Sequence, residues 1–509
     1  MAGIVKPNKA LAGSGGPVRQ RLRLGPGHVR FEAAKPDKRR RSAFDPLVGE
    51  LHALMLKGLD LAEGHRSTPR RAGEENSRNT ARLMNLSALL SKTVIKHGFS
   101  RDGRATGKRR ALQEGHNLTV LQVTPELNAG GVERTTLEIA EAISRAGGLA
   151  LVASAGGRLE PDLKTAGGEL IRIPAASKNP ITVIANAFKL ASIAKKRGVR
   201  IIHARSRAPA WSALLAARMA GVPFVTTYHG IYNAKSPVKT FYNSVMARGD
   251  AIIANSEFTR EHVLAHHDVM PERVTAIPRG VDLDVFDPAN ISAEEIAALR
   301  TKWGVAPNQC VILVPARLTR WKGQMVLIEA VRLLNERRPN AVKVILAGDD
   351  QGRRAYTQEM LSAIQGGKLQ QVVAMVGHLR QMPLAFAASD MAVFPVIEPE
   401  AFGRGAVEAE AMGVPVIASN LGGYTETVVE SQTGFLVPAG AAGPLCGAIE
   451  RMIDSGAEKR AEMGRKGQER VRALYSKTAL QSATLAVYQR VLSEADSRKA
   501  AKAPAQPVL

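Results

Sequence analysis

Short apolar runs alternate with amphipathic helical segments along most of the chain, and this alternation limits the possible folds more than any other feature. Each apolar run is too short for a helix, and a loop leads from it into the next helical segment. In the first half, strands are predicted at residues 118–123, 150–153, 170–173, 201–203, 224–227 and 251–254. The helices between them include residues 132–146, 181–196 and 208–220. Alternation on this scale predicts a parallel sheet covered by helices on both faces.

A proline-bounded segment, residues 278–288, interrupts this rhythm, and a second series of the same kind follows it. Its strands are predicted at residues 311–314, 342–347, 372–376, 391–396, 415–418 and 434–437. The chain is helical from about residue 441, and we expect its last helix, 477–494, to cross back to the first unit.

The sequence therefore predicts an α/β protein with two doubly wound, Rossmann-like domains that face a cleft, which is a favoured place for a ligand. We place these domains at residues 116–287 and 288–476. The returning helix and a loose tail occupy residues 477–509.

The first 115 residues differ in composition from the rest. They hold 24 lysines and arginines against 10 aspartates and glutamates, a surplus of 14 within a total net charge of +24. High charge with few apolar residues predicts a largely disordered basic extension. Residues 81–97 are an exception, because their leucines recur at roughly helical spacing. This segment is either a basic amphipathic helix on a membrane surface or a nascent helix without that role.

The positive charge suits nucleic acid, anionic lipid or a phosphorylated substrate equally well. A nucleic-acid-binding protein is disfavoured, because the basic extension offers only Phe31, Phe44 and Phe99 for stacking on bases. The two cysteines, Cys310 and Cys446, lie far apart, and no run of 18 apolar residues or apolar signal core occurs. We therefore expect a cytoplasmic protein.

Residues 398–413 follow a predicted strand and open a helix, which is where a doubly wound sheet presents its ligand site. Glu400 lies on the loop and Glu408 on the helix, with seven residues between them. The free N–H groups of a helix N-terminus favour a phosphate, and ionised carboxylates accept strong hydrogen bonds from hydroxyls. A phosphate next to many hydroxyls indicates a sugar nucleotide.

Two cations are predicted at the same edge of the second sheet. Arg317 ends the first strand of that domain, and Lys322 opens the helix after it. Together they can neutralise a diphosphate leaving group as charge develops on it.

The chain resembles the retaining glycosyltransferases of the GT-B fold, in particular the family 4 or group 1 set. The matching motifs in the first half are Gly130-Gly131-Val132-Glu133-Arg134, Tyr228-His229-Gly230, Ala254-Asn255-Ser256-Glu257-Phe258-Thr259 and Ile277-Pro278-Arg279-Gly280-Val281-Asp282. Those in the second half are Arg317 with Lys322-Gly323, Val376-Gly377-His378, the Glu400 and Glu408 pair, Gly422-Gly423 with Glu426, and Thr433-Gly434-Phe435-Leu436-Val437. The resemblance extends from about residue 118 to 490.

The resemblance implies roles for individual residues. Glu400 matches the glutamate that contacts donor-sugar hydroxyls, and Glu408 the one that holds the nucleotide ribose. Arg317 and Lys322 match the pair that binds the diphosphate. The other matches are the loop of Phe402, Gly403 and Arg404 at the sugar and phosphate, His378 near the base, Gly130 and Gly131 at the donor phosphate, and His229 near the transferred sugar.

The resemblance also implies an activity. It predicts the transfer of a hexosyl-type sugar from a nucleotide sugar to a saccharide or lipid-linked acceptor, with no cofactor and no metal. Cell-surface polysaccharide or lipopolysaccharide synthesis would be the setting, with peripheral contact to an anionic membrane and no nucleic acid partner. The alternatives are another GT-B activity, such as a synthase or epimerase, and the nucleic-acid-binding protein weighed above.

Two positions depart from the family pattern. Arg279 stands where asparagine is common, and Gln324 stands where aspartate often occurs. We expect neither to touch the site residues named above.

Three other motifs are given structural interpretations. Asp282-Leu283-Asp284 formally matches a metal-binding D-x-D pattern, but its place in the link predicts turn and capping carboxylates. His262 and His266 have zinc-ligand spacing, yet an exposed helical face explains them better. His203 is expected to be a core histidine with its hydrogen bonds satisfied, although its position leaves an acceptor-binding role open.

Overall fold

The computed structural model describes residues 118–128, 130–232 and 236–501. Its first half forms a parallel sheet with the strand order β3-β2-β1-β4-β5-β6-β7. These strands are β1 (Thr119–Val123), β2 (Leu149–Ser154), β3 (Gly168–Arg172), β4 (Ile201–Ala204), β5 (Phe224–Tyr228), β6 (Ala251–Ala254) and β7 (Val274–Ala276). The order reverses between β1 and β4, which pair in parallel from Val120 opposite Ile201. Such a reversal is a preferred place for a ligand.

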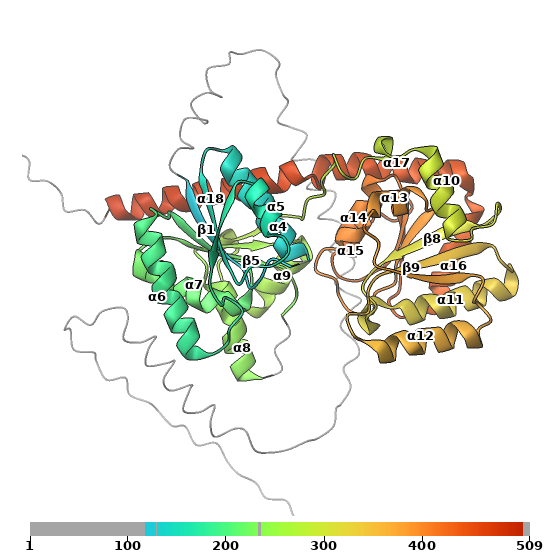
Figure 1. Ribbon diagram of the computed structural model, residues 1–509, viewed down its shortest axis with the longest axis horizontal. Helices are drawn as coiled ribbons and strands as arrows, with labels where there is room; N and C mark the ends of the chain where they lie inside the picture. The colour runs from blue at the N-terminus through green and yellow to red at the C-terminus, as the bar shows by residue number, and fades with distance from the viewer. Residues whose placement is uncertain (1–117, 129, 233–235, 502–509) are drawn as a thin grey trace, which may run out of the picture. The chain divides into compact units, whose positions relative to one another are not determined.

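Helices cover both faces of this sheet (Figure 1). They are α4 (Gly131–Arg145), α5 (Glu160–Thr165), α6 (Pro180–Lys196), α7 (Arg207–Ala220), α8 (Pro237–Ser244) and α9 (Glu257–His266), with short 3-10 turns η2 (Val245–Arg248) and η3 (Pro271–Arg273). Every residue of β4, β5 and β6 is buried, as expected for strands enclosed on both sides.

The second half repeats the design with the strand order β10-β9-β8-β11-β12-β13. Its strands are β8 (Cys310–Pro315), β9 (Val342–Ala347), β10 (Val373–Gly377), β11 (Met391–Phe394), β12 (Val416–Ser419) and β13 (Gly434–Val437). Here the order reverses between β8 and β11. The loops that follow these two neighbouring strands contain the predicted cations and Glu400.

The helices of the second half also lie on both faces of its sheet (Figure 1). They are η4 (Pro288–Asn290), α10 (Ala293–Lys302), η5 (Arg320–Lys322), α11 (Gln324–Arg337), α12 (Arg354–Gly366), α13 (Met382–Ala387), α14 (Arg404–Ala411), α15 (Tyr424–Thr427), α16 (Ala442–Asp454) and α17 (Gly456–Leu474). One apolar cluster fills each face, represented by Leu327 and Ile449 on one side and by Phe386 and Ala409 on the other.

The last helix, α18 (Lys477–Ala500), returns to the first sheet and lies along α4 (Figure 1). Its buried residues Leu480, Val487 and Val491 join the apolar cluster between that sheet and α4. The hydroxyl of Tyr488 is 2.6 Å from Nδ1 of the buried His203 on β4. The apolar contacts and this polar contact together anchor the end of the chain.

The sequence-based prediction of an α/β fold with two doubly wound parallel sheets is confirmed. It missed β7, whose three residues are too few to show a period. The predictions for residues 1–115, including the helix at 81–97, lie outside the described residues. Within the part of the chain that the structure describes, no helix is long and apolar enough to cross a bilayer.

Candidate active site

The loops after β8 and β11 bring Lys322 and Glu400 together. Gly323 has φ of +74°, and a Cβ there would lie 1.7 Å from the carbonyl oxygen of Pro395, so only glycine permits this close approach. The N–H of Ile397 donates to the carbonyl of Trp321 at 2.9 Å and joins the two loops. As a result, the ammonium of Lys322 donates to the carboxylate of Glu400.

Arg317 lies at the same edge with an exposed side chain. Its carbonyl accepts a 2.9 Å hydrogen bond from the amide of Gln324, whose own oxygen accepts from Tyr356. The expectation that Gln324 would not touch the site residues was therefore wrong. Its buried amide fixes the backbone from which Arg317 projects. Among the described residues, Arg317 forms no ion pair.

Helix α14 places Arg404 and Glu408 one turn apart, with Nε of Arg404 2.9 Å from Oε1 of Glu408. Burial raises the pKa of Glu408 above its ordinary value, and the charge of Arg404 offsets part of that effect. Gly403 immediately precedes the helix. Phe402 directs its side chain away into a core cluster with Val281 and Tyr475, so only its backbone is available to a ligand.

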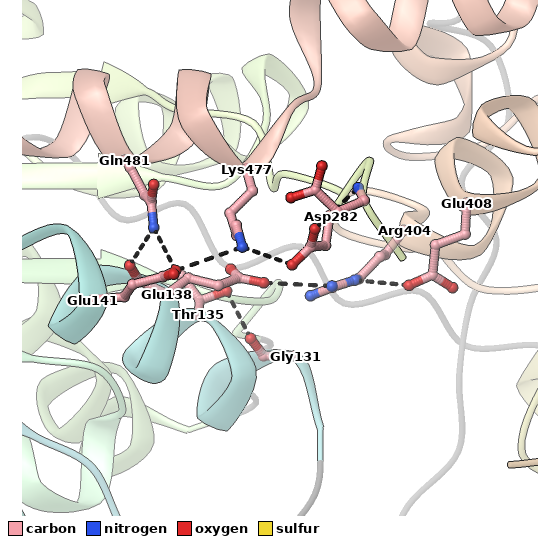
Figure 2. A network of polar contacts seen from close by, with 10 residues as sticks. Gly131, Thr135, Glu138, Glu141, Asp282, Arg404, Glu408, Lys477 and Gln481 are labelled. Carbon is pink, nitrogen blue, oxygen red and sulfur yellow. Dashed lines mark hydrogen bonds and ion pairs between the residues drawn. The ribbon is translucent and has the colours of Figure 1, made fainter. Parts of the chain in front are cut away.

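Arg404 also reaches the first half of the chain. Its Nη2 lies 3.5 Å from Oε1 of Glu138 on α4, and Figure 2 shows the guanidinium between Glu138 and Glu408. Nη1 of Arg404 and Oε2 of Glu138 are both buried, and neither has a hydrogen-bond partner among the described residues. Buried polar atoms of this kind are costly, and a bound polar ligand would satisfy them.

A cavity of about 650 Å³ lies at this point. The glycine loop, Gly130 and Gly131, lines it together with Glu138, and Arg404 and Glu408 line it from the second half. Arg134, Arg380 and Lys477 add positive charge to its wall, and Glu141, Asp162 and Asp282 add negative charge. The size and the mixed charges suit a ligand that has both phosphates and hydroxyls.

His229 and Arg279 form a second pair. Nη2 of Arg279 is 3.1 Å from Nδ1 of His229, and a Cβ on Gly131 would lie 1.5 Å from Nη1 of Arg279. Arg279 thus packs directly against the glycine loop, and the expectation that it would not touch the site residues was wrong. Sequence position could not reveal this contact, because the link containing Arg279 reaches the loop only through the tertiary fold.

Burial dominates the electrostatics of this pair. It lowers the pKa of His229 well below its ordinary value, and the nearby Arg279 and Arg205 lower it further, so the imidazole is neutral at pH 7. Burial also lowers the pKa of Arg279 to about 10, with Arg404 acting in the same direction and Glu400 opposing it. Arg279 therefore stays charged. Nε of Arg279 and Nε2 of His229 are buried without partners among the described residues.

The structure thus divides the predicted site residues into groups. Gly130, Gly131, Arg404 and Glu408 line the cavity. Two other pairs do not line it: Lys322 with Glu400, and Arg279 with His229. The charges of Glu400 and Arg404 nevertheless both shift the pKa of Arg279. His378 lies exposed after β10, and it forms no hydrogen bond or ion pair within the described part of the chain.

Sequence reasoning missed Arg279 and Glu138. A signal for Glu138 was present, because Arg134, Glu138 and Glu141 recur at intervals of four and three and so share one face of α4. For Arg279, the signal was the departure from the family pattern itself.

The three discounted motifs make the local contacts described here. Asp282 accepts from the N–H of Asp284, as expected for a turn residue, and it pairs with Lys477 at 2.6 Å (Figure 2). It also lines the cavity, which its predicted place away from the site did not anticipate. His266 bonds back to the carbonyl of His262 on its own helix. His203 is buried between Tyr488 and Thr227, with both ring nitrogens partnered. Within the described ranges, no group of three or more histidine, cysteine, aspartate or glutamate side chains is arranged to hold a metal ion.

Two further family motifs join the halves. The carboxylate of Glu426 accepts from the N–H groups of Glu257 and Phe258 at the start of α9, at 2.9 and 2.5 Å. The hydroxyl of Ser256 donates to the carbonyl of Ala401, next to Glu400, at 2.5 Å. Through these contacts, the first half helps to position the loop that contains Glu400.

Comparison with known proteins finds two family models in the chain, Glycosyltransferase Family 4 over residues 129–285 and Glycosyl transferases group 1 over residues 295–470. A solved glycosyltransferase from Rickettsia africae ESF-5 is 34% identical, and the match covers 74% of this chain and 99% of that one with a TM-score of 0.69. The chain belongs to the family 4, group 1 glycosyltransferases.

This glycosyltransferase is also similar to HepE of Anabaena, solved in complex with UDP, at 25% identity and a TM-score of 0.65. That match covers 73% of this chain and 100% of HepE. A D-inositol 3-phosphate glycosyltransferase from Pseudarthrobacter chlorophenolicus is 28% identical over 284 residues, which is 52% of this chain. The match spans 64% of that relative's length.

Proposed function

We propose that this glycosyltransferase moves a hexosyl-type sugar from a nucleotide-sugar donor to a hydroxyl of a saccharide or lipid-linked acceptor. The observation that supports this most directly is the contact of Lys322 with Glu400 where β8 and β11 meet. It places a cation suited to phosphate beside a carboxylate suited to sugar hydroxyls, at the strand-order reversal where doubly wound sheets bind ligands.

The chemistry follows from where charge develops. The bond between the anomeric carbon and the diphosphate oxygen breaks, and its electron pair leaves with the nucleoside diphosphate. Lys322, Arg317 and the N–H groups at the start of α14 would stabilise that negative charge. Glu400 orients the sugar through its hydroxyls, and Glu408 is assigned to the ribose.

We also propose retention of configuration. The acceptor oxygen bonds to the anomeric carbon on the face that the leaving group vacates, and its proton passes to the departing phosphate oxygen. His229, which lies beside Arg279, is a neutral imidazole. It would hydrogen-bond a sugar hydroxyl through Nε2, which has no partner among the described residues.

For the nucleotide of the donor we propose UDP, by analogy with HepE, which was solved with UDP. A phosphorylated or lipid-linked acceptor would suit the cations Arg134 and Arg380 on the cavity wall. We propose that the reaction takes place in the cytoplasm, at an anionic membrane, during cell-surface polysaccharide or lipopolysaccharide synthesis.

A donor panel scored by nucleoside diphosphate release tests the proposal, with thermal shift as the binding measurement. One donor should raise the melting temperature and release its diphosphate when acceptor is present. Glu400→Ala should lower turnover by about 10² to 10³, the scale for one preorganised electrostatic contact. Glu398→Ala is the matched control, because Glu398 is exposed on the same loop. Equal turnover in the two variants would contradict the role of Glu400.

The alternative activities on this fold give different products. A synthase would join the sugar to a free sugar phosphate, and an epimerase would release the isomerised sugar or nucleotide sugar without an external acceptor. Chromatography of the products from the same donor panel separates these reactions from transfer to a glycan.

A further inference from the structure

Helix α6 exposes three large apolar side chains on its outer face. Ile181, Ile184 and Phe188 are 79%, 52% and 61% exposed, and their spacing of three and four residues aligns them along one side of the helix. The inner side buries Leu190 and Ala194 against the domain core. The exposed residues therefore form an apolar ridge that the fold itself does not need.

The chain around this ridge is rich in basic residues, although some of them pair with acidic residues outside this segment: Arg172, Arg197, Arg200 and Arg218. Between Glu169 and Asp250 the sequence contains 13 lysines and arginines and no aspartate or glutamate. Lys178 precedes α6, and Lys195 and Lys196 end it; all three are exposed, and none forms an ion pair with another described residue. The apolar ridge is thus bordered by basic side chains and has no acidic neighbour on its own helix.

Helix α8 also exposes apolar and basic side chains. α6 and α8 both pack on α7 through adjacent residues, because Ser212 donates to the carbonyl of Val183 and Trp211 stacks on Phe241. α8 also lacks acidic residues, and it exposes Val238 and Lys239.

We propose that the α6 ridge is a docking surface for an anionic lipid bilayer. Ile181, Ile184 and Phe188 would enter the boundary between headgroups and acyl chains. The long lysine side chains would extend to the lipid phosphates. This surface rests on burial and charge in the first domain and does not depend on the donor chemistry proposed above.

Other occupants fit less well. Nucleic acid would match the charge, but Phe188 is the only aromatic residue of the ridge, and isoleucines do not stack on bases. A second copy meeting this face symmetrically would place like charges opposite each other. A bilayer with anionic headgroups satisfies the apolar ridge and the lysines together.

Insertion is tested with the full chain and a tryptophan placed on the ridge. The emission of the new tryptophan in Phe188→Trp, obtained by subtracting the spectrum of the parent protein, should shift to the blue with phosphatidylglycerol-containing vesicles. Brominated lipids should quench this emission. Leu361→Trp is the control, because Leu361 is 43% exposed on α12 of the other domain. Since the probe reports its own surroundings, binding through the N-terminal extension cannot produce the signal. If both probes or neither probe responds, the proposal is overturned.

The charge contribution is tested by vesicle flotation. Lys195→Glu with Lys196→Glu should weaken partitioning onto anionic vesicles by at least about 30-fold, the effect of losing two positive charges near such a surface, to which the charge reversal adds. Arg354→Glu on α12, which is exposed and outside the α6 face, should change it less than threefold. Equal partitioning of the two variants would contradict the proposal. So would a concentration-dependent dimer that Phe188→Ser abolishes, because the ridge would then be a self-association surface. Donor turnover in solution is a separate measurement, so failure here leaves the transferase proposal standing.

Discussion

The guanidinium of Arg279 contacts the ring of His229, with Nη2 3.1 Å from Nδ1, and it lies against the glycine loop at Gly131. This contact joins the interdomain link to two family motifs that are distant in the sequence.

Replacing Arg279 with asparagine, the residue common in the family, should lower kcat/KM for sugar transfer by about 10². The buried positive charge would be lost, while His229 would keep its place. Because Arg279 lowers the pKa of His229, the acid limb of the pH–rate profile should move toward neutral pH. Arg279→Lys keeps the charge and should stay within about tenfold of the parent. An unchanged rate and pH profile for Arg279→Asn would show that Arg279 has only a packing role.

Lys322 and Glu400 should behave as a coupled pair in a double-mutant cycle. Lys322→Ala and Glu400→Gln should each lower turnover by about 10² to 10³, and the double variant should lose less than the product of the two, because they contact each other. Steady-state release of nucleoside diphosphate measures all four proteins. Strictly multiplicative losses would mean that the two residues act independently.

Turnover should not require a divalent cation if Lys322, Arg317 and the α14 N-terminus neutralise the diphosphate as proposed. Adding excess EDTA to the assay should change the initial rate by less than about twofold. A rate abolished by EDTA and restored by Mg²⁺ would contradict this assignment.

Glu410 should make stability depend on pH. It is fully buried on α14, and burial raises its pKa to about 8 from an ordinary 4.5, despite Thr433 and Arg470. The folded state therefore binds the proton more tightly than the unfolded state, and stability should fall as pH rises from about 4.5 to 8.

Glu410→Gln should remove this dependence. At pH 8 the variant should be more stable than the parent by a few kcal/mol, at about 1.4 kcal/mol per unit of pKa shift, and the two should converge near pH 4.5. Urea unfolding at both values measures the difference. If the free energies of unfolding of the two proteins differed by the same amount at both pH values, titration of Glu410 could not be the source of the difference.

Tyr488→Phe should destabilise the protein by about 1–3 kcal/mol, because it leaves a ring nitrogen of the buried His203 without a partner. Thr484→Val on the same helix is the control, since that hydroxyl bonds to the carbonyl of Leu480 in its own helix and to no other residue in the described part of the chain. Chemical unfolding should show a cost below about 1 kcal/mol for the control. Equal costs would mean that the bond to His203 adds nothing to the anchoring of α18.

The sequence predicted most strands and helices, because local periodicity determines them. It predicted less of the site. Glu400 and Glu408 could be named from their strand, loop and helix context, and the position of Lys322 at the same edge followed from parallel strands. The contact between Lys322 and Glu400 also needs β11 to lie next to β8, an order that no local pattern encodes.

The sequence by itself determined the two doubly wound domains and the residue types near a phosphate and a sugar, because these depend on hydrophobic period and on chemistry at strand ends. Only the tertiary structure decided that Arg404 meets Glu138, that Arg279 meets His229, and that α6 keeps an apolar ridge outside the core. Each of these depends on which segments the fold brings together or leaves uncovered. Such long-range relations follow from strand order and domain packing rather than from neighbours in the chain.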